Sequence, residues 1–227
     1  MKKRLVVLTG AGMSAESGIS TFRDSGGLWE GHDVTKVASP EGFASDPELV
    51  LDFYNQRRKN VRESAPNDAH CFLAELEKQF ELTIVTQNID DLHERGGSSN
   101  IIHLHGEIKK AQSTGVPSLI YDLGDGDIYL GDTCERGHQL RPFIVWFGEP
   151  VPKMDEALAV TLQADIFLVI GTSLQVYPAA GLLQYAPGHS KKVLVDPKAS
   201  NMYLPQDVKV INTTAVESIP YLKETLL

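Results

Sequence analysis

The sequence predicts an α/β fold, a Rossmann-like doubly wound parallel sheet with a smaller inserted lobe. Two observations predict it: short β-branched runs that are apolar on both faces, and helical segments between several of these runs. Strands that alternate with helices are typical of a parallel sheet covered on both faces. The expected strands are Leu5–Leu8, Leu82–Val85, Ile101–Leu104, Ile166–Ile170, Val193–Val195 and Val208–Ile211.

The helices between these strands are expected at three places. One opens at Pro66-Asn67-Asp68-Ala69 and runs through Phe80, and the others cover Met154–Ala164 and Pro178–Tyr185. Two stretches depart from the alternation. Residues 31–65 are helical in pattern, and residues 107–142 are polar and rich in Gly and Asp, with a weak hairpin signal around Leu119–Leu130.

Insertions of this kind predict a second, smaller lobe within one domain of residues 1–227. The small lobe takes about 31–65 and 107–142, and the large lobe takes about 1–30, 66–106 and 143–227. The cleft between such a lobe and a sheet edge is a natural ligand site.

Composition and charge restrict the class of protein. The 227 residues are 42% apolar and 22% charged, which is ordinary for a soluble globular chain. No apolar run approaches the roughly 18 residues of a membrane span. The apolar run after Met1-Lys2-Lys3-Arg4 is too short for a signal peptide, so we expect a cytoplasmic protein with no membrane partner. The net charge of −9 argues against nucleic-acid binding. We expect a monomer.

A glycine-rich loop follows the first expected strand. Gly10-Ala11-Gly12-Met13-Ser14-Ala15 matches G-x-G-x-x-G/A, in which glycines bring backbone N–H groups close to a pyrophosphate. The alternative is a simple tight turn between strand and helix. The acidic residue expected about 20 positions on is absent from a second strand, and Glu30 lies in a loop, so an ordinary dehydrogenase is disfavoured.

Polar residues stand at the ends of three further strands. Thr86-Gln87-Asn88-Ile89-Asp90 follows one strand, His103-Leu104-His105-Gly106 ends another, and Gly171-Thr172-Ser173 follows a third. Because the carboxyl ends of parallel strands meet at one edge of a sheet, we expect these groups to converge beside the glycine loop.

Here the sequence resembles the sirtuin family, the NAD-dependent protein lysine deacylases, and in particular its bacterial class III members. The matching segments are "GAGMSAESGISTFR", "TQNIDDLHERGG", "HLHGE", "LRPFIVWFGE" and "IGTSLQVYPAAGL", in the family's order. The resemblance implies the sirtuin fold, NAD as cofactor, and acylated-lysine proteins or peptides as partners. The implied reaction transfers succinyl, malonyl or acetyl groups from lysine and yields nicotinamide and O-acyl-ADP-ribose.

The resemblance also implies roles for individual residues. His105 is the expected base on the ribose hydroxyls, a task that suits a histidine pKa, and Asn88 is expected to position a ribose water. Arg23 is expected to hold NAD and order the loop over it, the alternative being a surface arginine. His103 is expected to be structural. The implied cofactor-binding residues are Gly10, Ala11, Gly12, Ala15, Thr21, Phe22, Arg23, Trp29, Gln87, Asn88, Ile89, Asp90, Gly171, Thr172, Ser173, Asp196 and Ala215. Asp196 departs from the asparagine that many sirtuins carry there.

The helix from Pro47, capped by Asp46 or Ser45, carries an apolar stripe of Val50, Phe53, Tyr54 and Val61. Arg57 lies on this stripe, and an arginine on a buried face needs an anionic partner. Tyr54 and Arg57 match the tyrosine–x–x–arginine pair with which class III sirtuins read the carboxylate of succinyl- or malonyl-lysine. The alternative is a salt bridge to a core Asp or Glu. Arg58, Lys59 and Arg62 are expected on a solvated face.

The segment Phe143–Glu149 resembles the sirtuin segment that pairs its backbone with an extended substrate. The substrate-binding residues implied by the resemblance are Tyr54, Arg57, Val145, Phe147, Gly148, Glu149 and Val176.

The resemblance is weakest in residues 107–139. Sirtuins usually carry four zinc-binding cysteines in the region that matches 107–142. This stretch holds only Cys134, with His138 four residues on, and structural zinc needs more ligands. Acidic substitutes at Asp122, Asp125 or Asp127 are the alternative. We expect no zinc. The lobe is instead expected to have its own core in paired strands, formed by Leu119, Ile120, Tyr121, Ile128, Tyr129 and Leu130.

Two other functions stay open from the sequence alone. One is mono-ADP-ribosyl transfer from the same NAD pocket, and the other is a non-enzymatic sensor of NAD metabolites. The presence of His105, Tyr54 and Arg57 together favours deacylation.

Overall fold

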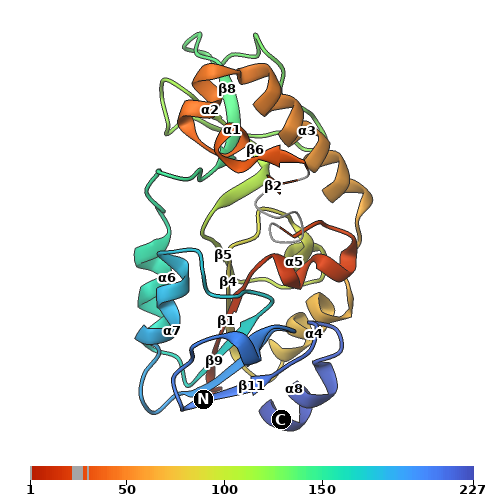
Figure 1. Ribbon diagram of the computed structural model, residues 1–227, viewed down its shortest axis with the longest axis vertical. Coiled ribbons are helices and arrows are strands. Elements are labelled where there is room, and N and C mark those ends of the chain that lie inside the picture. The colour runs from red at the N-terminus through yellow and green to blue at the C-terminus, as the bar shows by residue number, and fades with distance from the viewer. Residues whose placement is uncertain (1, 22–27, 30) are drawn as a thin grey trace.

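The computed structural model describes residues 2–21, 28–29 and 31–227, with Leu28 and Trp29 described by their backbone alone. The main sheet is six-stranded and parallel throughout, which confirms the predicted fold class (Figure 1). In spatial order its strands are β11 (Val208–Ile211), β10 (Lys191–Val195), β9 (Ile166–Ile170), β1 (Arg4–Thr9), β4 (Glu81–Thr86) and β5 (Ile101–His103). The order reverses between β1 and β9, and such a switch point opens a crevice at the carboxyl ends of the strands.

Helices cover both faces of this sheet, because its strands are apolar on both sides. Leu5 and Val7 of β1 pack toward helices α4 and α8, while Val6 and Leu8 pack toward α6 and α7. Figure 1 shows these helix pairs on opposite sides of the sheet. The helices of this lobe are α4 (Asp68–Leu76), α5 (Leu92–Arg95), α6 (Met154–Thr161), α7 (Leu182–Tyr185) and α8 (Ile219–Leu226), with short 3-10 turns η1 (Ala11–Met13), η2 (Ala15–Ser17), η3 (Ala179–Gly181) and η4 (Ala199–Asn201).

The expected helices are present, with shorter ends than the pattern indicated. Asn67 caps α4, its side chain accepting from the backbone N–H groups of Ala69 and His70, so the helix begins at Asp68. It ends at Leu76 rather than Phe80. The expected helix from Pro178 is divided into η3 and α7.

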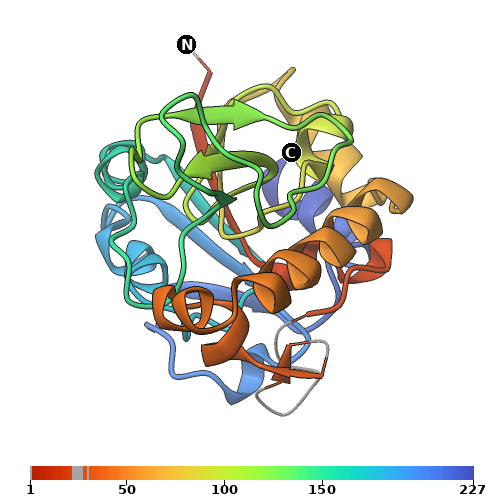
Figure 2. The same ribbon diagram turned by 90° about the horizontal axis from the view of Figure 1, so that it is seen from above.

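The smaller lobe stands above the carboxyl ends of the sheet (Figures 1 and 2). Its helices are α1 (Val34–Val37), α2 (Pro40–Ser45) and α3 (Pro47–Glu63), after a short pair of strands β2 (Leu28–Trp29) and β3 (His32–Asp33). Its sheet has the order β7 (Ile120–Asp122), β6 (Gly106–Ser113) and β8 (Leu140–Ile144), all antiparallel.

The N-terminus of α3 is capped by Asp46, whose carboxylate accepts from the Leu49 N–H at 3.0 Å, whereas Ser45 ends α2. The predicted apolar stripe of α3 is confirmed, since Val50, Phe53, Tyr54 and Val61 all belong to one buried cluster.

The prediction of a hairpin over Leu119–Leu130 is wrong. β7 pairs with β6, not with residues 128–130, and Ile120, Tyr129 and Leu130 are exposed. Of the six expected core residues, Ile128 is buried, in a cluster with Leu51 of α3 and Ala111 of β6. The reason is that β6 and α3, which lie outside the expected hairpin, supply the apolar surface that this stretch covers.

The solvated-face prediction is also wrong for Arg58, which is fully buried. Its Nε donates to the Ile108 carbonyl at 2.9 Å, and its Nη1 donates to Asn55 Oδ1 at 2.6 Å and faces Asp127 at 3.5 Å. The residues after β7 cover the second face of α3, which no helical periodicity within α3 reveals. Lys59 does lie on a solvated face, beside Glu63.

Candidate active site

Two glycine-containing loops interlock at the switch point of the sheet. Gly10 N–H donates to the Ile170 carbonyl at 3.1 Å, and Gly12 N–H donates to the Gly171 carbonyl at 2.8 Å. A Cβ on Gly12 would lie 2.7 Å from the Gly171 Cα, and one on Gly171, whose φ is +65°, would lie 2.3 Å from the Met13 nitrogen. Close backbone approach therefore requires glycine at these positions.

The end of β4 is tied to the glycine loop by side chains. Asn88 Nδ2 donates to Ser14 Oγ at 3.1 Å, and Ser14 Oγ donates to Asp90 Oδ2 at 3.0 Å. The Gln87 side-chain amide donates to Thr172 Oγ1 at 3.2 Å, which connects β4 to the loop after β9. Burial raises the pKa of the Asp90 carboxyl, against the hydrogen bonds from the Leu92 N–H and Ser14.

His103, at the end of β5, and His105, two residues later, differ in the number of ring nitrogens that carry a proton. His103 faces two acceptors, Glu94 Oε1 at 2.7 Å from Nε2 and the Asn88 carbonyl at 3.3 Å from Nδ1. Burial opposes the charged form, but the hydrogen bond and charge of Glu94 outweigh it and raise the pKa of His103. Both ring nitrogens are engaged as donors, so His103 cannot accept a proton from a substrate.

His105 has one engaged nitrogen, Nδ1, which lies 3.0 Å from the Gln87 carbonyl. A carbonyl only accepts, so Nδ1 carries the proton and Nε2 keeps its lone pair. Burial lowers the pKa of His105, and the hydrogen bond to Gln87 opposes that shift only in part. The imidazole is therefore neutral near pH 7, the form that a general base requires.

One cavity of about 460 Å³ connects these groups with helix α3 of the small lobe. Every expected site residue whose side chain the structure describes lines this cavity. From the cofactor-binding set they are Gly10, Ala11, Gly12, Ala15, Thr21, Gln87, Asn88, Ile89, Asp90, Gly171, Thr172, Ser173, Asp196 and Ala215, and from the catalytic and substrate-binding sets they are His105, Tyr54, Arg57, Val145, Phe147, Gly148, Glu149 and Val176. Phe22, Arg23 and the side chain of Trp29 lie outside the described residues.

The acyl-recognition candidates lie at the small-lobe end of the cavity. Tyr54 is fully buried and Arg57 is 6% exposed, and the two are one turn apart on α3. The Arg57 guanidinium carbon lies 6.0 Å from the centroid of the Phe53 ring. Burial raises the pKa of Tyr54 well above the usual value, so its hydroxyl keeps its proton.

Ser14 and Trp146 are among the cavity residues that the sequence analysis missed. Ser14 links Asn88 and Asp90, and its place inside the glycine motif was the available signal. Trp146 donates from its indole nitrogen to the Tyr54 hydroxyl oxygen at 3.0 Å. It stands within the segment "FIVWFGE", but nothing in the sequence shows that it reaches α3.

The expected peptide-binding segment makes its own hydrogen bonds. Val145 N–H donates to the His105 carbonyl, and Phe147 N–H donates to the Ala38 carbonyl, each at 2.9 Å. The Glu149 carboxylate accepts from Arg141 and from the Trp146 N–H. Pairing with a peptide therefore has to use other backbone groups of this segment.

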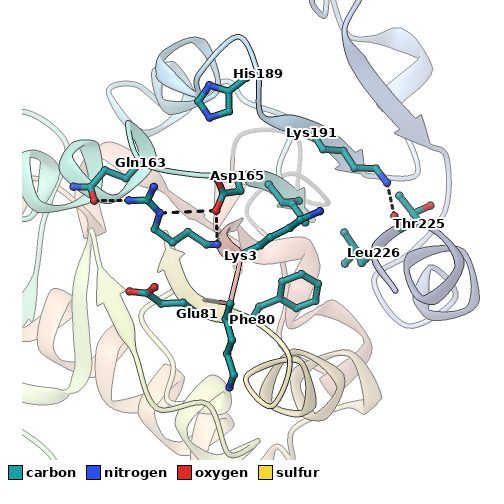
Figure 3. Close-up of a pocket in the computed structure, with 12 residues that line it drawn as sticks. Lys3, Phe80, Glu81, Gln163, Asp165, His189, Lys191, Thr225 and Leu226 are labelled. Atoms are coloured by element: carbon teal, nitrogen blue, oxygen red, sulfur yellow. Dashed lines mark hydrogen bonds and ion pairs between the residues drawn. The ribbon is translucent and has the colours of Figure 1, made fainter.

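A second depression, of about 1170 Å³, lies at the amino ends of the strands, the opposite edge from His105 (Figure 3). Arg4 is bonded there to Gln163 and Asp165, and Lys191 reaches the Thr225 carbonyl. These paired, solvent-facing charges are typical of a polar surface and combine no nucleophile with a base.

In the part of the chain that the structure describes, no group of three or more His, Cys, Asp or Glu side chains is placed to hold a metal ion. Cys134 is buried, and Ser113 Oγ donates to its sulfur at 3.3 Å. Over the same residues, the helices are all too short or too polar to cross a membrane.

Comparison with known proteins places these features in one family. The sequence model of the Sir2 family matches residues 10–178. An NAD-dependent protein deacylase of Helicobacter pylori strain 26695 is 54% identical over 225 residues, 99% of this chain and 98% of the relative. One of Bacteroides thetaiotaomicron is 53% identical over 230 residues, again 99% and 98%. A solved structure of a Sir2 homolog–NAD complex superposes with a TM-score of 0.85 at 36% identity, covering 100% of this chain and 91% of that one.

Proposed function

Because this chain belongs to the Sir2 family and is an NAD-dependent protein deacylase, we propose that it removes succinyl and malonyl groups, as well as acetyl groups, from lysine side chains. The observation that carries the proposal is the burial of Tyr54 and Arg57 in the cavity that also holds His105. A guanidinium and a phenol one helical turn apart suit a substrate carboxylate, because both present N–H or O–H donors.

The residues of the cavity fit NAD. The interlocked glycines form a cradle that side chains would fill, next to the amides of Gln87 and Asn88. In the proposal, the glycine loop with Thr172 and Ser173 holds the phosphates and adenosine, and Asp90 holds the nicotinamide amide. Asp196 and Ala215 lie on the adenosine side. When bound, NAD supplies an electrophilic ribose carbon to the acyl oxygen of the substrate.

The protein's own residues divide the remaining work. His105 Nε2 is the atom placed to take a proton from a ribose hydroxyl, because its Nδ1–H is held by the Gln87 carbonyl. Asn88 positions a ribose water, its backbone N–H fixed on Thr86 Oγ1 at 3.0 Å. Val145, Phe147, Gly148, Glu149 and Val176 are proposed as walls for the acyl-lysine and its peptide.

The test compares acetyl-, malonyl- and succinyl-lysine peptides of one flanking sequence, each with NAD. We expect acyl-ADP-ribose from all three and the highest kcat/KM with the acidic acyl groups. Arg57→Met should lower kcat/KM for the succinyl peptide by roughly 10- to 100-fold, the value of a charge-assisted hydrogen bond. Arg62→Met is the matched control, on the same helix but outside the cavity.

Two outcomes would contradict the proposal. If Arg57→Met lowers acetyl and succinyl turnover by one factor, Arg57 is a structural residue and the acyl assignment is wrong. If nicotinamide is released without consumption of any acyl peptide, the chain is a mono-ADP-ribosyltransferase of the same fold.

A further inference from the structure

Trp146 connects the acyl end of the cavity with an ion pair of the small lobe. Its side chain is 2% exposed and lines the cavity beside Tyr54 and Arg57. The indole Nε1–H donates to the Tyr54 hydroxyl oxygen at 3.0 Å. The ring centroids of Trp146 and Tyr54 are 6.4 Å apart and the rings are tilted by 36°. The polar contact between the two side chains is therefore the hydrogen bond from the indole nitrogen to the phenol oxygen.

The indole is held on two sides. The guanidinium carbon of Arg141 lies 3.4 Å from the centroid of the Trp146 ring, which is a close cation–π contact. Arg141 also donates to both carboxylate oxygens of Glu149, at 2.7 and 3.0 Å, and to the Ile144 carbonyl at 2.8 Å. The same carboxylate accepts from the Trp146 backbone N–H at 2.8 Å.

This arrangement determines how the Tyr54 hydroxyl can bond. A phenol has one proton and accepts through its oxygen. The indole N–H is a donor only, so it occupies the oxygen of Tyr54 as an acceptor and turns the phenol's own proton away from Trp146. A phenol oriented in this way suits an anionic acyl group, which only accepts hydrogen bonds, and offers nothing to the methyl group of an acetyl-lysine.

We propose that Trp146 is a specificity-determining residue of the acyl site, because its indole N–H orients the Tyr54 hydroxyl as a donor to the carboxylate of the acyl group. Arg141 and Glu149 are positioning residues that hold the indole in place. The inference rests on the proposed function, in which Tyr54 and Arg57 read a succinyl or malonyl carboxylate.

The first experiment is a double-mutant cycle on the full chain, read as the ratio of kcat/KM for succinyl-lysine to kcat/KM for acetyl-lysine peptides. Trp146→Phe keeps a ring under Arg141 and removes the N–H. We expect this ratio to fall about 3- to 10-fold, the range of one neutral hydrogen bond. In a Tyr54→Phe background Trp146→Phe should lower the ratio no further, because the hydroxyl it orients is gone. Tyr129→Phe, an exposed tyrosine of the small lobe, is the matched control.

The cycle separates failure of this inference from failure of the proposed function. If Tyr54→Phe and Arg57→Met leave the ratio unchanged, the proposed function is wrong and the inference falls with it. If these two variants lower the ratio but Trp146→Phe does not, or lowers it equally with and without the Tyr54 hydroxyl, the inference alone is overturned.

The second experiment addresses the positioning pair through tryptophan fluorescence. The chain has two tryptophans, so a Trp29→Phe background reports on Trp146 alone. Arg141→Met in that background should red-shift the emission and increase quenching by acrylamide, and in the Trp29-containing chain it should lower the succinyl-to-acetyl ratio. Arg141→Lys keeps the charge without the bidentate fork and should recover the ratio only in part. Unchanged emission and an unchanged ratio in Arg141→Met would refute the positioning role.

Discussion

The contacts that stabilise the carboxyl edge of the six-stranded sheet differ from those that stabilise the three-stranded sheet of the small lobe. At the carboxyl edge, backbone meets backbone through Gly10, Gly12 and Gly171, and short polar side chains join the strand ends. In the small lobe, β6 and the residues after β7 cover α3. Ile128 packs with Leu51 of α3, and the buried Arg58 of α3 donates to the Ile108 carbonyl of β6. The first region tolerates almost no added atom, whereas the second is a small core that depends on a few long side chains.

This difference matches the proposed division between catalysis at the carboxyl edge and acyl recognition in the small lobe. Hydrogen bonds at the carboxyl edge hold His105, Asn88 and Asp90 in place, which suits the catalytic and cofactor-binding roles proposed for them. The small lobe contributes Tyr54 and Arg57 from one helix, next to Trp146, and these are the residues proposed to read the acyl group. Variants in each region, a pH profile and metal analysis test this difference.

The largest effect is expected at the carboxyl edge. His105→Ala should lower kcat/KM by about 10²- to 10⁴-fold, the usual loss of general-base catalysis, with the fold and NAD binding retained. Steady-state kinetics measure the loss in kcat/KM, and calorimetric titration with NAD measures the retained binding. His138→Ala, an exposed histidine of the small lobe, is the control. Turnover within a few-fold of the unmodified chain would show that His105 is not the base.

The same residue gives a pH expectation. Burial lowers the pKa of His105, so its unprotonated form persists below the usual histidine value of about 6.5. The acidic limb of kcat/KM should therefore lie below that value. If the acidic limb of the unmodified chain lies above about pH 6.5 and disappears in a His103→Gln variant, the titrating group is His103 and not His105.

The second prediction compares two glycines with positive φ, one from each region. Gly171→Ala should lower the free energy of unfolding by about 1–2 kcal/mol for the left-handed backbone and by about 1–3 kcal/mol more for the clash with the Met13 nitrogen. Gly124→Ala, at φ +55° with nothing within 4 Å of its added Cβ, should show the backbone cost alone. Urea unfolding measures both variants, and equal losses would show that the loops at the edge can separate.

The third prediction concerns His70, a buried histidine on helix α4. His70 is fully buried and burial lowers its pKa to about 4, so the unfolded chain binds a proton that the folded chain rejects between about pH 6.5 and pH 4. The free energy of unfolding should fall by about 2–3 kcal/mol as pH drops through that range. His70→Gln should flatten this dependence in urea melts at several pH values. The exposed His189→Gln should leave the slope unchanged, and a slope unaffected by His70→Gln would assign it to other groups.

The smallest effect is expected from metal removal. Elemental analysis of chain purified without chelator should find far less than one zinc per molecule, and EDTA should leave the melting temperature unchanged. A stoichiometric zinc would implicate Cys134 and His138 and show that the small lobe needs more than its own core.

Much of the carboxyl edge was predictable, because its determinants are local. Leu5–Leu8 predicts a buried parallel strand by composition alone, and the polar residues after Val85 and Ile170 follow in sequence. The strand-end residues therefore converge beside the glycine loop, as the order of the strands predicts. The rest of the expected site residues came from the resemblance to the sirtuin family. The small lobe was predicted less well, since Ile120 and Tyr129 are exposed and Arg58 is buried.

Periodicity and turn chemistry act over a few residues, so they are sufficient to predict the sheet, its strand-end residues and the helix that carries Tyr54 and Arg57. Only the tertiary structure decided that β7 pairs with β6, that Arg58 is enclosed by Ile108, Asn55 and Asp127, and that Trp146 reaches the Tyr54 hydroxyl. The physical reason is distance along the chain. Asn55 is hydrogen-bonded to the Ile128 backbone because two insertions fold onto each other, and no local pattern records which surface an insertion will cover.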